Sequence, residues 1–168
     1  DSSLVTVANE PPVVTLSADD ETINEGDTVN FTGTATDPGG DDLTIFWDYG
    51  DGDTANGGLA RAHTYVDDGV YNALLRATDT NDEVGQATVE ITVANVAPAV
   101  TLQDATVVEN SSVNLLVAIT DPGTQDTHTC VWDLGDGSDA VNNDCSNIAH
   151  TYRNDGVFTV TVVASDGE

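Results

Sequence analysis

The feature that most constrains this chain is a six-residue motif that occurs twice. The first copy runs from Trp47 to Gly52 and reads WDYGDG, and the second runs from Trp132 to Gly137 and reads WDLGDG. Each copy holds one of the chain's two tryptophans and is followed by the tripeptide His-Thr-Tyr, at 63–65 and at 150–152. A chain that places its only tryptophans in register is a tandem repeat. The 168 residues therefore predict two domains of roughly 85 residues each.

Short segments with alternating apolar residues predict strands throughout both repeats. From Val29 onward, every second residue of 28–36 is apolar or small, and residues 43–49 alternate in the same way from Leu43. Clusters of Asp, Gly and Pro, such as 37–42, separate these segments and predict turns. No segment has a helical pattern of useful length. We therefore expect an all-β chain of two antiparallel β-sandwiches, with both tryptophans in their cores.

The repeats are out of phase with the ends of the sequence. Residues 5–9, VTVAN, match residues 91–95, ITVAN, which end the first repeat. Residues 1–8 therefore predict a strand equivalent to the last strand of a preceding repeat. We expect a first domain at 9–95 and a second at 96–168, which has no counterpart of residues 84–94. One hypothesis is that the strand at 1–8 completes the second domain of a neighbouring copy, and the alternative is that the sequence is a window of a longer array.

The chain is strongly acidic, with a formal net charge of −27 and only three basic residues, all arginines. This charge excludes ordinary nucleic-acid binding, because few cations are available to contact phosphates. It also disfavours anionic membranes, and no apolar run approaches the roughly 20 residues of a membrane span. Because such self-repulsion costs stability unless cations screen it, we expect a salty or calcium-rich environment. The alternative is a surface whose acidity only keeps the protein in solution.

Cys130 and Cys145 are the only cysteines, and they predict one structural disulfide in an oxidising compartment. The alternative is two free thiols in a reducing compartment. The three histidines and two cysteines lack the ligand spacing of a zinc site, so His63 and His150 are interpreted as hydrogen-bonded loop residues. No signal peptide is visible, which favours a mature or excised segment. The glycosylation sequons at Asn30 and Asn110 are weak signals.

These motifs resemble those of the PKD (polycystic kidney disease) repeat. The family's signature is a Trp-Asp-aromatic-Gly-Asp-Gly run, then His-Thr-Tyr, then a Gly-x-Tyr strand that ends at an aspartate, here Asp79 and Asp166. The resemblance covers nearly the whole chain. It implies tandem immunoglobulin-like β-sandwiches. It also implies an extracellular or cell-surface setting, as in secreted bacterial and archaeal proteins that use such repeats as spacers, adhesin modules, surface-layer parts and appendages to hydrolases.

The resemblance also implies Ca²⁺ sites, because calcium-binding members of the family place oxygen ligands at one pole of the sandwich. The set combines the linker before the domain, two aspartates of the loop after the second strand, and the aspartate that ends the long hairpin strand. In the second loop position of the first repeat, either Asp41 or Asp42 matches, and Asp42 is preferred. The alternative is that these residues only solvate loops. The matching positions are Asn9, Asp37, Asp42 and Asp79 in the first repeat, and Asn95, Asp121, Asp126 and Asp166 in the second.

No nucleophile elbow, phosphate-binding loop or metalloprotease motif is visible, so we expect no enzymatic activity. The predicted function is a structural module, a cation-stiffened spacer or a subunit of a surface or filamentous assembly. Its expected partners are neighbouring copies or adjoining repeats. The alternative is a module of a secreted enzyme or adhesin that binds glycans or cell-surface proteins, which exposed aromatic residues would favour.

Overall fold

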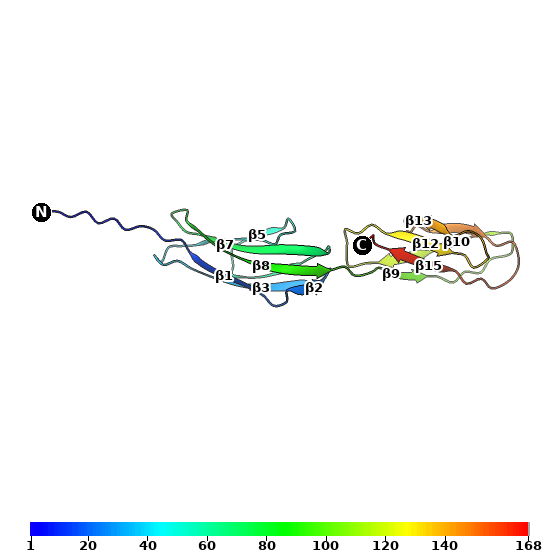
Figure 1. The fold of residues 1–168 in the computed structure, drawn as a ribbon. Coiled ribbons are helices and arrows are strands. Elements are labelled where there is room, and N and C mark those ends of the chain that lie inside the picture. Colours follow the sequence, from blue (N-terminus) through cyan, green and yellow to red (C-terminus); the bar gives the residue numbers. More distant parts are fainter. Residues whose placement is uncertain (168) are drawn as a thin grey trace. The chain divides into compact units, whose positions relative to one another are not determined.

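The computed structural model describes residues 1–167 and divides into two compact units, Asp1–Ala94 and Asn95–Glu168. Each unit is built from β-strands alone, as the strand labels of Figure 1 show. The described residues form no helix, and so none that could cross a bilayer. The predicted all-β class is confirmed.

The first unit is a sandwich of two sheets. One sheet has the strand order β1-β3-β6 and the other has the order β2-β8-β7-β4-β5. All pairs are antiparallel except β2 with β8, which run parallel. The strands are β1 (Val13–Ala18), β2 (Thr22–Asn24), β3 (Thr28–Thr36), β4 (Thr44–Asp48), β5 (Thr54–Asn56), β6 (Ala60–Thr64), β7 (Gly69–Thr78) and β8 (Val84–Ala94).

The core of the first unit lies between these sheets and explains the alternation of the sequence. Val29 and Phe31 of β3 face Trp47 of β4 and Leu75 of β7, and all four side chains are buried. The Trp47 indole is fully buried and donates a hydrogen bond through Nε1 to the Gly58 carbonyl at 3.0 Å. The predicted core position of this tryptophan is confirmed.

The second unit has the same plan with shorter and more divided sheets. Its strand orders are β11-β9, β10-β14 and β13-β12-β15, all antiparallel. The strands are β9 (Ala99–Leu102), β10 (Ser112–Leu115), β11 (Val117–Thr120), β12 (Thr129–Asp133), β13 (Val141–Asn143), β14 (Ile148–Thr151) and β15 (Thr161–Ser165).

The core of the second unit is centred on the second tryptophan. Trp132 is fully buried, as predicted, and packs with Leu115, Cys130 and Leu134. A disulfide joins Cys130 to Cys145, which confirms the predicted pair. The buried cluster is smaller than that of the first unit, where β8 contributes Ile91 and Val93. Among residues 1–167, no strand follows β15 to add side chains of that kind.

Two local predictions differ from the structure. Residues 1–12 form no strand, although the alternation at 1–8 predicts one, because a strand needs a hydrogen-bonded neighbour and this segment has none in its unit. In addition, His63 and His150 lie on β6 and β14 rather than in loops. The short strands β2 and β5 fall in segments rich in turn residues, where periodicity is too brief to predict a strand.

Candidate metal centre

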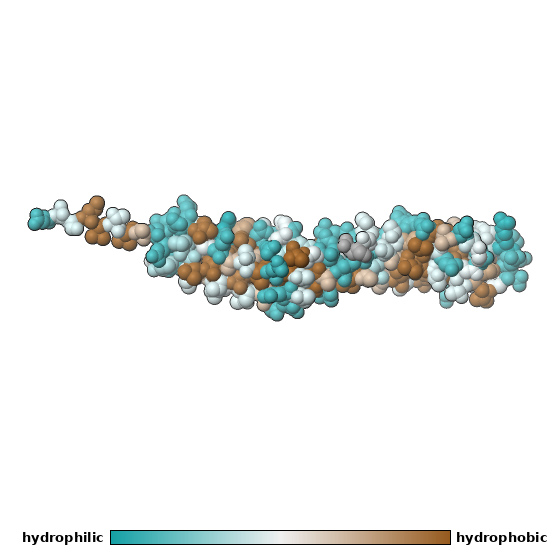
Figure 2. Space-filling view, viewed as in Figure 1, coloured by the Kyte–Doolittle hydropathy of each residue, from teal (hydrophilic) through white to brown (hydrophobic). Residues whose placement is uncertain are grey.

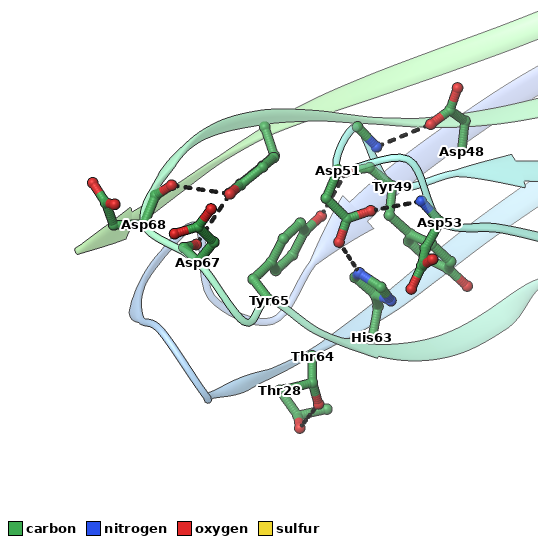
Figure 3. Close-up of polar contacts among 12 residues, drawn as sticks. Thr28, Asp48, Tyr49, Asp51, Asp53, His63, Thr64, Tyr65, Asp67 and Asp68 are labelled. Carbon is green, nitrogen blue, oxygen red and sulfur yellow. Dashed lines mark hydrogen bonds and ion pairs between the residues drawn. The ribbon is translucent and has the colours of Figure 1, made fainter. Parts of the chain in front are cut away.

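The polar side chains of the repeated WDxGDG motif make hydrogen bonds that hold the fold together. In the first unit, one oxygen of Asp51 lies 2.6 Å from His63 Nε2, and the other accepts a hydrogen bond from the Asp53 backbone N–H at 3.0 Å. The Tyr65 hydroxyl donates to the Tyr49 carbonyl at 3.0 Å. Figure 3 shows these groups converging beside the turn that follows β4. The motif therefore ties β6 to this turn.

The second unit repeats the same contacts. Asp136 lies 2.7 Å from His150 Nε2 and accepts from the Ser138 hydroxyl at 2.6 Å. The Tyr152 hydroxyl donates to the Leu134 carbonyl at 3.1 Å. His63 and His150 are therefore structural, hydrogen-bonded residues, as interpreted from the sequence.

The glycine of each turn is required by close packing. Gly50 and Gly135 have φ values of 88° and 74°, in the left-handed region that favours glycine. A Cβ atom at Gly50 would lie 2.9 Å from the Asn72 backbone nitrogen, and one at Gly135 would lie 2.4 Å from the Thr159 carbonyl oxygen. The first glycine of WDxGDG thus allows the turn to pass against a neighbouring backbone segment, which is β7 in the first unit.

The Asp136 contact predicts a pH dependence. Hydrogen bonds from Ser138 and His150 lower the pKa of Asp136 from 3.8 to about 2. Because the folded-state pKa is depressed, the contact stabilises the second unit above about pH 4, and this contribution is lost as the pH falls towards about 2. We expect Asp136→Asn to make the unfolding midpoint of the second unit less dependent on pH across this window, measured by thermal unfolding.

Asp139→Asn is the matched control for this experiment, because Asp139 is exposed in the same loop. It removes the same charge and should keep the wild-type pH dependence. An Asp136→Asn protein with the wild-type pH dependence would contradict the prediction.

Three carboxylates cluster at the pole of the first unit where the chain enters β1. One carboxylate oxygen each of Asp37, Asp41 and Asp79 lie within 4.8 Å of one another. Asp37 and Asp41 belong to the loop between β3 and β4, and Asp79 follows β7 directly. Asn9 comes from the N-terminal linker, and its Nδ2 donates to Asp79 Oδ2 at 2.7 Å. Residues from three separate segments thus meet at one place. Asn9, Asp37 and Asp79 are among those expected from the sequence, and Asp41 takes the place for which Asp42 was preferred.

Local hydrogen bonds hold this cluster in place. Asp79 Oδ1 accepts from the backbone N–H groups of Asn81 and Glu83 at 2.8 and 2.9 Å, so the turn after β7 fixes its carboxylate. Asp37 Oδ1 accepts from the Asp41 backbone N–H at 3.1 Å, which folds the loop on itself. The hydrogen bond from Asn9 is the main reason that the pKa of Asp79 lies below 3.8, so this carboxyl is ionised at neutral pH.

The donors of this cluster fit a calcium ion. Ca²⁺ takes six to eight oxygen ligands, mostly carboxylate, carbonyl and water. Asp79 is 5% exposed, and Asp37 Oδ2 is buried without a hydrogen-bond partner in the described part of the chain. A buried carboxylate oxygen without a partner is costly unless a cation or water binds it. Asp37, Asp41 and Asp79 are the groups that would hold Ca²⁺. Asn9 would supply an oxygen ligand after its amide turned, because its Nδ2 faces Asp79 in this structure.

Asp42 lies outside this cluster. It is exposed, whereas Asp41 is half-buried and turned towards Asp37. The sequence analysis preferred Asp42, but the family pattern matches both adjacent aspartates and does not distinguish them. The folded loop brings the Asp41 carboxylate within 4.8 Å of those of Asp37 and Asp79.

The second unit brings together only part of its expected set. Asp121 and Asp126 have carboxylate oxygens within 4.8 Å of each other, and Asn95 and Asp166 have buried side-chain oxygens. Asp121 Oδ2 lies 2.8 Å from His128 Nε2, so a histidine contacts the first aspartate of the loop. Counted back from the equivalent tryptophans, the first unit has Leu43 at the corresponding place. A calcium site in the second unit therefore stays a prediction. One of its expected ligands, Asp121, has His128 as a neighbour.

Several solved structures are similar to one half of this chain. The PKD domain of an M14-like peptidase from a Thermoplasmatales archaeon is 30% identical, with a TM-score of 0.46, and the match covers 51% of this chain and 98% of that domain. The PKD1 domain of the Vibrio cholerae metalloprotease PrtV is 24% identical, with a TM-score of 0.42, and the match covers 50% of this chain and 98% of that domain.

A structure of carbohydrate-binding modules from the β-sandwich superfamily matches over a longer span. It is 13% identical, with a TM-score of 0.48, and the match covers 94% of this chain and 85% of that one.

The sequence profile of the PKD domain matches this chain twice, at residues 9–93 and at residues 95–168. The two matches together span most of the 168 residues and fall on the two units of the structure. The chain belongs to the PKD-domain family, as a tandem pair of its β-sandwich domains.

Proposed function

We propose that this chain is a spacer or subunit of an extracellular surface assembly, stiffened by Ca²⁺ at the pole of its first unit. The observation that carries this proposal is the cluster of Asp37, Asp41 and Asp79 around the linker residue Asn9. An ion held there would join the N-terminal linker, the loop after β3 and the turn after β7, because each segment supplies one or more ligands. The linker would then move with the sandwich.

The family and the disulfide support an extracellular, non-catalytic role. PKD domains are generally non-catalytic modules of secreted or surface proteins. The disulfide between Cys130 and Cys145 fits an oxidising compartment. The contacts of the WDxGDG motifs support the same role, because the histidines and aspartates that most resemble catalytic groups hold turns and strands together.

The charge of the chain supports cation binding. A net charge of −27 raises the free energy of the folded state by self-repulsion, and the cluster concentrates three carboxylates at one pole. A divalent cation would remove this local repulsion and supply a partner for the buried oxygen of Asp37. The proposal therefore links the acidity of the chain to a defined site.

Glycan binding, the alternative function, receives less support from the side chains. Glycan-binding modules commonly stack sugar rings on exposed aromatic residues. All nine aromatic residues of this chain lie in its described part, and each is buried or half-buried. The half-buried Phe46 is covered by Arg76, whose guanidinium carbon lies 4.7 Å from the ring centroid. A spacer or assembly role therefore agrees better with the surface.

Calcium is expected to stabilise the first unit. At a free Ca²⁺ concentration about tenfold above the dissociation constant, we expect its unfolding midpoint to rise by about 5–10 °C relative to excess chelator. Asp37→Asn should abolish this rise, because it removes the charge that lacks a hydrogen-bond partner and keeps an oxygen that can accept from Asp41. Thermal unfolding and isothermal titration calorimetry measure the two effects.

Asp42→Asn is the matched control, because it removes one charge from the same loop but lies outside the cluster. It should keep the calcium response. A wild-type midpoint that is the same in Ca²⁺ and in chelator would overturn the calcium part of the proposal, as would equal responses of the two variants.

A further inference from the structure

The two glycosylation sequons of the chain lie in different kinds of structure. A sequon is the pattern Asn-x-Ser/Thr, in which the asparagine amide nitrogen of an exported chain can carry a glycan. The first sequon, 30–32, lies within β3, and the second, 110–112, joins a turn to the start of β10. The fold therefore separates two sites that the sequence pattern treats as equal.

The first sequon is held by the sheet on both sides. Within it, β3 pairs with β6 at Asn30 and with β1 at Phe31, and the Phe31 side chain is 1% exposed in the core. The Asn30 amide is also engaged, because its Nδ2 donates to Asp19 Oδ2 at 2.7 Å. A transferase must draw the sequon out of the fold into its own binding cleft. Leaving β3 would break strand pairing and expose Phe31, so the fold withholds Asn30.

The second sequon lies in an exposed turn. Residues 108–111 form a β-turn closed by a hydrogen bond from the Ser111 N–H to the Val108 carbonyl at 3.0 Å. Asn110 is the third residue of this turn and has a φ of 59°, a conformation that glycine and asparagine adopt more readily than other residues. The side chains of Asn110, Ser111 and Ser112 are exposed, and within residues 1–167 none of them makes a hydrogen bond.

The exposure of this turn is a property of the repeat. In the first unit, Gly26 has a φ of 80° and donates to the Tyr65 carbonyl at 2.7 Å, as the Asn110 N–H donates to the Tyr152 carbonyl at 2.8 Å. Gly26 is exposed too. Figure 1 shows the loop before β10 at one end of the second unit, and Figure 2 shows hydrophilic residues at that end. Asn110 thus places an amide where the first unit has no side chain.

We propose that Asn110 is an N-glycosylation site of this chain and that Asn30 is not. The donor is an oligosaccharide linked to a lipid phosphate carrier. The Nδ2 atom of Asn110 forms a bond to C1 of the first sugar, while the bond between C1 and the phosphate oxygen of the carrier breaks. The amide proton passes to a base of the transferase, and the lipid phosphate leaves. The inference goes beyond the calcium proposal and needs only the extracellular location.

Transfer to Asn110 needs only a local opening of the fold. The sequon is tied by the two backbone hydrogen bonds of its turn and by the first pair of β10, Ser112 with Thr151. By contrast, β3 is the central strand of the sheet β1-β3-β6. Exposed turns open at a lower free energy than central strands. The second sequon can therefore reach a transferase without unfolding its unit.

The first test compares the two sequons on the folded chain. The oxidised chain is incubated with lipid-linked oligosaccharide and a purified oligosaccharyltransferase that accepts Asn-x-Ser/Thr, and peptide mass spectrometry measures occupancy. We expect occupancy at Asn110 to exceed that at Asn30 about tenfold or more. Synthetic peptides spanning 25–36 and 105–116 are the unfolded controls, and both should be glycosylated. Equal occupancy of the two asparagines in the folded chain would overturn the proposal, as would an unmodified Asn110.

Two substitutions test whether the sequon directs the reaction. Ser112→Ala removes the hydroxyl that the sequon requires and should abolish glycosylation at Asn110. Ser111→Ala is the matched control, because it removes a hydroxyl from the adjacent residue but keeps the sequon, and it should keep the wild-type occupancy. Both serines are exposed, so neither substitution should affect folding. A glycan that persists in Ser112→Ala, or that is lost in Ser111→Ala, would contradict the assignment.

The second test is mass spectrometry of the protein isolated from the organism that makes it. Peptides that contain Asn110 should carry a glycan mass that deglycosylation removes, and peptides that contain Asn30 should have the unmodified mass. An unmodified Asn110 in the native protein would overturn the proposal. The calcium response is measured on a chain expressed without an oligosaccharyltransferase, so the failure of either proposal leaves the other intact.

Discussion

Replacing Trp132 by alanine is expected to destabilise the second unit by about 3–5 kcal/mol, enough to unfold much of it. The indole is fully buried among Leu115, Cys130 and Leu134, and its Nε1 donates to Asn143 Oδ1 at 3.2 Å. The substitution therefore leaves a large cavity and removes the hydrogen bond that the Asn143 side chain accepts from the indole. Circular dichroism and denaturant titration would measure the loss.

The distribution of tryptophans makes this variant informative about both units. Each unit holds one tryptophan, so Trp132→Ala leaves Trp47 as the only indole fluorophore. We expect Trp47 fluorescence to report an unfolding midpoint of the first unit close to that of the wild type. Trp47→Ala is the matched control. It should destabilise the first unit and leave the unfolding midpoint of the second unit, reported by Trp132 fluorescence, close to that of the wild type. A midpoint for Trp47 that falls together with the second unit would contradict independent folding of the two units.

Reduction of the disulfide is expected to destabilise the second unit by about 3 kcal/mol, because the bond closes a loop of 15 residues. The bond joins β12, the strand that holds Trp132, to the loop that follows β13. Asn143 Oδ1 accepts from both the Trp132 indole and the Cys145 backbone N–H, so the cross-link holds a segment that contacts the core. Thermal unfolding with and without reductant would measure the shift.

A double variant, Cys130→Ala with Cys145→Ala, is the control for reduction. Its unfolding should not respond to reductant, and its second unit should be less stable than that of the oxidised wild type. The first unit has no cysteine, so its midpoint should be the same in both redox states. A reductant effect of equal size in the double variant would show that the disulfide is not the cause.

Much of the fold could be predicted because its signals are local. Alternation around Val29 and Leu43 marks strands with one buried face, since side chains on a strand point to opposite sides in turn. The WDxGDG motif, repeated with its His-Thr-Tyr partner, identifies both the repeat and its core residue. The short strand β2 was missed because three residues carry too little periodicity, and its parallel pairing with β8 joins segments about 70 residues apart.

The candidate metal centre could be predicted only in part. The family pattern names the segments that meet, and Asn9, Asp37 and Asp79 do meet in the structure. It does not distinguish Asp41 from Asp42, because adjacent aspartates differ only in which way the folded loop turns them. In the second unit, the contact of Asp121 with His128 has no counterpart in the first, and no spacing rule predicts it.

By itself, the sequence determined the class of fold, the number of repeats, the core tryptophans and the disulfide, because each depends on residue types at short, regular spacing. It also showed that residues 5–9 repeat the pattern of residues 91–95. Only the tertiary structure decided which carboxylates converge and which of the two sequons lies in an exposed turn. The physical reason is that both features depend on long-range packing, in which segments far apart in sequence become neighbours only after the sheets have formed.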